Sequence, residues 1–130
     1  MKGIGIDMLG DAVANIAVKD LKIAKKFYED TLGLEQVDAE GQEVIVFKSG
    51  NSTVNVYRSQ YAGTNQATAV TWVVGKDIEN VVRALKAKGI TFEHYDMPDI
   101  TREGDLYIAG DMKVAWFKDP DGNILNIVNR

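Results

Sequence analysis

The chain has no cysteine and a single histidine, His94. Without cysteine it cannot form a disulfide, a thiolate metal site or a cysteine nucleophile. It also lacks the run of about 18 apolar residues that a membrane-spanning helix requires. Asp7 and Asp11 interrupt the apolar residues near the N-terminus, so we do not expect a signal peptide there. These features predict a cytoplasmic protein with no membrane partner.

The chain also has fewer basic than acidic residues. The 15 Lys and Arg residues are outnumbered by 19 Asp and Glu residues, and the formal net charge is −4. The basic residues form no cluster that would attract phosphate backbones, so nucleic acid is not an expected partner. The composition is that of a globular protein, with 45% hydrophobic and 26% charged residues. A chain of 130 residues is long enough to fold as a single domain, residues 1–130, without a structural metal.

The chain contains an internal repeat. The segment NIAVKDLKIAKKFYEDTLGLE resembles TWVVGKDIENVVRALKAKGITFE, and the aspartates of their shared Lys-Asp pair, Asp20 and Asp77, lie 57 residues apart. Further along, VIVFKSGNSTVNVYR resembles VAWFKDPDGNILNIVNR. Two copies are too few for a solenoid. They predict one domain with two similar modules, at about residues 10–60 and 67–130.

Each module is predicted to begin with a strand and a helix. Residues 12–18 and 68–74 are rich in Ala, Val, Ile and Thr, which favours strands. Asp20 and Asp77 then occupy the N-cap positions of two amphipathic helices.

Three further strands are predicted after each helix. A glycine ends the helix in both copies, and the last two strands are joined by turns at 49–51 and 119–123. The fold class is therefore α+β, with two tandem βαβββ modules. The segment 92–112 has little periodicity, and we expect a long loop that is either functional or plain surface.

The repeated pattern, with FYEDTLGLE in the first module and WFKDPDGNILNIV in the second, resembles the glyoxalase/bleomycin-resistance/extradiol-dioxygenase family, also called the vicinal oxygen chelate superfamily. This resemblance covers about residues 12–128. It implies curved mixed sheets around a cleft, helices outside, and a homodimer. Such a cleft takes small molecules. The family includes lyases, epimerases, dioxygenases, thiol transferases and antibiotic-binding proteins, so the fold leaves the function open.

The resemblance also implies where a divalent metal would be bound in metal-dependent relatives. These have a His on the first strand of each module, seven residues before the Asp that opens the helix, and a Glu on the last strand. The matching positions here hold Val13, Val70, Asn55 and Asn126. Valine has no lone pair and an amide oxygen is a weak ligand. We therefore expect no metal at these positions and no cofactor.

Side chains alternate along a strand, so the residues that share a face with these positions are expected to line the cleft. Trp116 and Phe117 are adjacent, and only one of them can face the cleft. Aromatic rings would stack on a flat ligand and amides would orient it, although core packing is the alternative for Trp72. The expected ligand-binding residues are Asn15, Asn55, Tyr57, Trp72, Trp116, Phe117 and Asn126.

Two further features of the second module bear on the ligand and the chemistry. The segment 96–111 contains five acidic residues and one basic residue, Arg102, so it either attracts a cationic ligand or is a solvated loop. His94 is the candidate catalytic acid or base, with a surface position as the alternative.

These patterns favour a metal-independent small-molecule-binding protein over an enzyme. Its role would be to sequester an aromatic or cationic antibiotic-like compound. The alternative is a glyoxalase-like lyase or isomerase that acts without the standard His/Glu metal site, with His94 or a tyrosine moving protons. A third possibility is an interaction module in which segment 92–112 closes on a ligand or contacts a partner.

Overall fold

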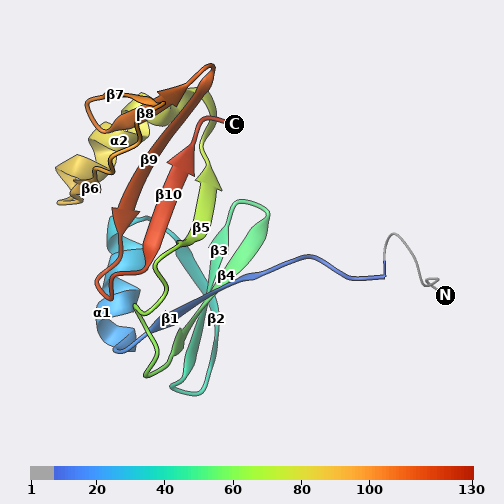
Figure 1. Ribbon diagram of the computed structural model, residues 1–130. Coiled ribbons are helices and arrows are strands. Elements are labelled where there is room, and N and C mark those ends of the chain that lie inside the picture. Colours follow the sequence, from blue (N-terminus) through green and yellow to red (C-terminus); the bar gives the residue numbers. More distant parts are fainter. Residues whose placement is uncertain (1–7) are drawn as a thin grey trace.

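The computed structural model describes residues 8–130, and the structural statements below concern that part of the chain. In chain order its elements are β1 (Ala14–Val18), α1 (Leu21–Lys25), η1 (Lys26–Thr31), β2 (Glu35–Glu40), β3 (Val44–Ser49), β4 (Ser52–Arg58), β5 (Thr68–Val73), η2 (Gly75–Asp77), α2 (Ile78–Ala87), β6 (Phe92–Glu93), β7 (Thr101–Glu103), β8 (Leu106–Ala109), β9 (Met112–Lys118) and β10 (Ile124–Val128) (Figure 1). None of the helices described is long and apolar enough to cross a membrane.

The strands form two sheets, one from each half of the chain. The first has the order β1-β4-β3-β2 and the second the order β5-β10-β9-β8-β7, with β6 paired to β9. In each sheet the first strand is parallel to the last one of its module, and the other pairs are antiparallel. Figure 1 shows α1 and α2 beside the strands of their own halves. The prediction of two βαβββ modules in an α+β fold is confirmed.

Both helices begin directly after the predicted N-cap residue, Asp20 or Asp77, but only Asp20 caps its helix with its side chain. The Asp20 carboxylate accepts the N–H groups of Lys22 and Ile23 at 2.8 and 3.2 Å. Asp77 makes no side-chain capping bond, because the 3₁₀ turn η2 leads directly into α2. The first strand begins two residues later than expected, and β5 ends one residue earlier.

One hydrophobic core runs through both halves of the molecule. Both helices contribute to it, as does the helix-facing side of each sheet. Burial of this apolar surface is the main stabilising term in a domain of this size. The largest fully buried side chains are Tyr28, Phe47, Phe117, Ile16, Ile78, Leu125, Val18 and Val56.

Hydrogen bonds at the turn between β9 and β10 join the halves. The Tyr28 hydroxyl donates to Asp119 Oδ2 at 2.6 Å, and these residues are 0% and 5% exposed. Asp119 also accepts the N–H groups of Asp121 and Asn123, and the Asn123 amide donates to Asp119 Oδ2 and to the Ala17 carbonyl. Burial raises the pKa of Tyr28, and the Asp119 charge raises it further. The turn is thereby fixed to the end of β1.

The segment 92–112 contains a hairpin, so the expectation of a long loop was wrong. Strands β7 and β8 pair, and β8 adds to the sheet through β9. The Tyr107 hydroxyl donates to the Tyr95 carbonyl at 2.9 Å and anchors the chain that leads into the hairpin. The three residues of β7 are all exposed, so they carry no apolar alternation from which a strand would be predicted.

Replacing Tyr28 by Phe should lower the free energy of unfolding by about 1.5–3 kcal/mol, because the buried Asp119 carboxylate loses a donor. Since the pKa of Tyr28 is raised in the folded protein, its stabilising effect is complete below about pH 10, the ordinary tyrosine pKa, and is lost as the pH rises further. Urea unfolding from pH 7 to 11 measures both effects. Tyr61→Phe, at a side chain that is 70% exposed, is the control and should change little.

Gly63→Ala should be more destabilising than Gly50→Ala. Both glycines have positive φ, 75° and 57°, so alanine is strained at either position by about 1–2 kcal/mol. Only at Gly63 would the new Cβ lie 2.1 Å from the Asp121 carbonyl oxygen. Thermal melts of the two variants compare the costs, and equal losses would show that the close approach at Gly63 is unimportant.

Candidate functional site

The first sheet has a core face toward α1 and an open face on its other side. Asn15 pairs with Asn55 and Ala17 with Tyr57, so these four side chains share a face. The intervening Ile16 and Val18 are buried in the core. Asn15, Asn55 and Tyr57 therefore share one open face, and their part in binding a ligand stays a prediction.

A hollow of about 530 Å³ lies on this open face. The Asn55 Nδ2 group donates to Asn15 Oδ1 at 3.3 Å, and Asn15 Nδ2 donates to the Val13 carbonyl at 3.5 Å. Tyr57 is 37% exposed and keeps its ring available. The residues that line the hollow are Asn15, Glu40, Val44, Val46, Asn55 and Tyr57.

Glu40 is a lining residue that the sequence analysis missed. On β2, Gln36 pairs with Phe47, whose side chain is in the core, but Asp38 pairs with Val46 on the open face. The register therefore shifts at Val37. Strand alternation from Gln36 gives the wrong face for Glu40, and nothing in the local sequence identifies this bulge.

On the second sheet, Asn126 pairs with both Thr71 and Trp116, so these three share the open face. The Trp116 ring meets Tyr95 and Tyr107 edge to face, with centroids 5.7 and 5.3 Å apart. Asn126 is 8% exposed, and its buried Oδ1 has no hydrogen-bond partner within residues 8–130. Burying an unpaired amide oxygen lowers the stability of the fold, so Asn126 is a candidate for hydrogen bonding to a ligand.

Tyr95 also has a buried polar atom without a partner. Its hydroxyl makes no hydrogen bond to any residue that the structure describes. Burial raises the pKa of Tyr95, and the Glu93 charge raises it further, so this group is a neutral phenol at physiological pH. A neutral phenol donates a hydrogen bond rather than acting as a base.

The expected placement of Trp72 in the cleft is wrong. Trp72 pairs with the buried Ile127, packs against the core, and donates from Nε1 to Ser49 Oγ at 2.9 Å. Gly75, with φ of 69°, opens the turn η2 and adds one residue between β5 and the helix. Counting back from Asp77 by the first module's spacing therefore ends on the wrong face, for Trp72 and likewise for Val70.

Phe117 does not face the cleft either. It is fully buried, and its ring lies edge-on against Phe92 with centroids 5.7 Å apart. Trp116 is consequently the member of this pair on the open face. Among the described residues, no side-chain hydrogen bond or ring contact joins Trp116 and Asn126 to the Asn15–Asn55 pair.

His94 lies in a charged cluster that fixes the β7–β8 hairpin. Its Nε2 is 2.8 Å from Asp105 Oδ1, and Lys86 Nζ is 2.9 Å from the other carboxylate oxygen. Burial of Asp105 acts to raise its pKa, but hydrogen bonds from His94 and Lys86 outweigh this and hold the pKa below its usual range. Because the preceding Glu93 pairs with Trp116, alternation places His94 on the opposite side of the sheet from Trp116.

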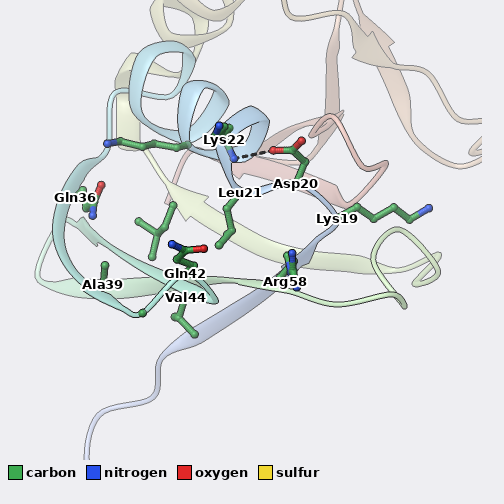
Figure 2. A pocket seen from close by; sticks show the side chains of 12 residues that line it. Lys19, Asp20, Leu21, Lys22, Gln36, Ala39, Gln42, Val44 and Arg58 are labelled. Carbon is green, nitrogen blue, oxygen red and sulfur yellow. Dashed lines mark hydrogen bonds between the residues drawn. The ribbon is translucent and has the colours of Figure 1, made fainter.

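A second hollow, of about 670 Å³, lies between α1 and the hairpin of β2 and β3 (Figure 2). Two of its polar side chains already have partners: Asp20 caps the helix, and Arg58 Nε is 3.3 Å from Glu43. Figure 2 shows the Lys19 side chain extending away from the hollow. The smaller hollow beside the Asn15–Asn55 pair is therefore the better candidate site.

Residues 6–127 match the Glyoxalase/Bleomycin resistance protein/Dioxygenase superfamily. The chain belongs to this superfamily. Solved structures of similar fold include a member of the superfamily from Sphaerobacter thermophilus, with 23% identity over 93% of this chain and 98% of that one and a TM-score of 0.65. A lactoylglutathione lyase from Agrobacterium tumefaciens has 18% identity over 92% of each chain and a TM-score of 0.66. The fosfomycin resistance protein FosX from Listeria monocytogenes has 13% identity over 92% of each chain and a TM-score of 0.69.

The residues at the superfamily's metal positions do not fit a divalent ion. Correcting the register by one residue moves the expected position in the second module from Val70 to Ala69, which also lacks a ligating atom. With Val13, Asn55 and Asn126 this leaves two aliphatic side chains and two neutral amides. Elsewhere within residues 8–130, no group of three or more His, Asp or Glu side chains is placed to hold a metal.

Asn126→Leu should leave the free energy of unfolding unchanged or raise it by about 1 kcal/mol, because an unpaired buried amide is replaced by an apolar group of similar size. Asn123→Leu is the matched comparison at another buried asparagine, 6% exposed, whose amide donates two hydrogen bonds. It should lose about 2 kcal/mol or more. Denaturant unfolding of both variants makes the comparison, and an equal loss in both would mean that Asn126 is a structural residue.

Proposed function

We propose that the chain is a metal-independent small-molecule-binding protein of the superfamily. Its ligand binds on the open faces of the sheets, and its role is to sequester an aromatic or cationic compound of antibiotic-like character. The observation that carries the proposal is the hollow beside the Asn15–Asn55 pair, where the superfamily's metal positions hold neither His nor Glu. Its volume of about 530 Å³ is in the range of small-molecule sites.

The proposed site has two parts, one on each sheet. The first comprises Asn15, Asn55 and Tyr57, which offer amides and one aromatic ring around the hollow. The second comprises Trp116 and Asn126, a ring for stacking and a buried amide without a partner. Trp72 and Phe117 are excluded from it, since both belong to the core face.

A second copy of the chain is proposed as a partner. Strands β1 and β5 are edge strands of their sheets. Val13, directly before β1, is 40% exposed, and Val73, on β5, is 65% exposed. Exposed apolar side chains at unpaired edges favour association. Native mass spectrometry of gently purified protein should give a dimer without metal. A stoichiometric divalent metal in that spectrum would contradict metal independence.

A lyase or isomerase that works without metal is the second candidate. The Tyr95 hydroxyl is the observation that favours it, because this unpartnered donor on a half-buried ring beside Trp116 could hydrogen-bond to a substrate oxygen. Turnover that survives a chelator and is lost in Tyr95→Phe would replace the binding proposal by this one. His94 is the alternative proton carrier, although it lies on the α2 side of the sheet.

Asn55→Ala should weaken binding of a neutral aromatic probe, 1-naphthalenemethanol, about five- to tenfold. The reason is that the hollow loses a hydrogen-bonding group worth about 1 kcal/mol and the orientation of Asn15. Asn51→Ala, in the exposed turn of the same hairpin, is the matched control and should bind normally. NMR titration measures both affinities. Normal binding by Asn55→Ala, or probe-induced shifts only at distant residues, would remove the hollow as the ligand site.

A further inference from the structure

The hydrogen-bonding groups of the hollow on the first sheet are unbalanced. The Asn55 Nδ2 group donates a hydrogen bond to Asn15 Oδ1, and Asn15 Nδ2 donates one to the Val13 carbonyl. Each amide uses one of its two N–H groups in these bonds, while Asn55 Oδ1 and the Glu40 carboxylate accept no hydrogen bond from the described residues. A bound molecule that supplies donors would match these acceptors.

The charge of the hollow points the same way. Glu40 lines it, and none of the ion pairs between described residues includes Glu40. Asp38 shares the same face through its pairing with Val46 and adds a second negative charge nearby. The closest basic residue on this face by register is Lys48, which lies two positions beyond Val46 on β3 and is paired across the strands with Glu35.

The remaining walls are apolar and aromatic. Val44 and Val46 are half-buried, so they form a floor that is partly shielded from water, and the Tyr57 ring stands beside them. A cation above a tyrosine ring is stabilised by the ring's quadrupole, and more so where water is excluded. An apolar body on the valines with a positive charge between Tyr57 and Glu40 would match the apolar floor, the ring and the carboxylate of the hollow.

We propose that this hollow selects an organic cation, a protonated amine or guanidinium group carried on a flat apolar body. Glu40 faces the charge, Tyr57 provides its ring, and Asn55 Oδ1 accepts an N–H donor. The inference rests on the proposed function, which places the ligand in this hollow, and goes beyond it by assigning the charge and the residue that recognises it. The acidic segment 96–111 has no role in this selection, and its Asp105 is already bound to Lys86 and His94.

Three probes with one ring system test the assignment at pH 7: 1-naphthylmethylamine, which is a cation, 1-naphthalenemethanol, which is neutral, and 1-naphthoate, which is an anion. We expect the amine to bind about fivefold tighter than the alcohol, because a partly exposed charge pair contributes about 1 kcal/mol. The anion should bind most weakly. In 0.5 M NaCl the preference for the amine should shrink, because exposed charges are screened.

Glu40→Gln removes the charge and keeps the shape. In this variant the amine should lose its advantage while the alcohol binds as before. Glu103→Gln, the same change on the exposed strand β7, is the matched control and should leave both affinities unchanged.

Two kinds of failure are distinguishable. Equal binding of amine and alcohol by the unaltered protein, or an amine preference that persists in Glu40→Gln, would overturn the cation assignment and leave the binding site in place. Absence of binding by all three probes, with no shift of the Asn15 and Asn55 side-chain amide signals, would overturn the proposed function together with it.

Discussion

The hydrogen bond between Tyr28 and Asp119 is the contact on which the arrangement of the two halves depends. It joins the helical segment of the first half to the β9–β10 turn of the second, in a region where both residues are buried. A buried carboxylate is tolerated only when its oxygens are fully hydrogen-bonded, and here the turn's own N–H groups and Asn123 complete the set. The same turn binds the backbone of β1, so the strands that carry Asn15 and Asn126 are positioned by one network.

The two open faces use asparagine in different ways. Asn15 and Asn55 are hydrogen-bonded to each other at the surface of a hollow, so having these two amides at the site costs little folding stability. Asn126 is buried beside Trp116 with an unpaired oxygen, a state that lowers stability unless a ligand completes it. Residues retained at the expense of stability are typical of binding sites. Among the side chains on the second open face, this distinguishes Asn126 from Thr71, which is exposed to water.

Much of the fold was predictable because its signals are local. The periodicity of Leu21, Ala24 and Tyr28 identifies the helix and its buried face, and the Asp20 cap depends only on residues within one helical turn. The hairpin β7–β8 was not predictable in the same way. Its outer strand, β7, is exposed on both sides. Its sequence therefore lacks the alternation of apolar and polar residues from which a strand would be predicted.

By itself, the sequence determined the module order, the helix faces and the absence of His and Glu at Val13, Asn55 and Asn126, since each depends on residue type or on short spacing. Only the tertiary structure decided which residues share the open faces. Gly75 adds one residue after β5, and the bulge at Val37 shifts β2 by one. Because side chains alternate with a period of two, each single-residue shift reverses the face, which placed Trp72 on the core face and Glu40 at the hollow.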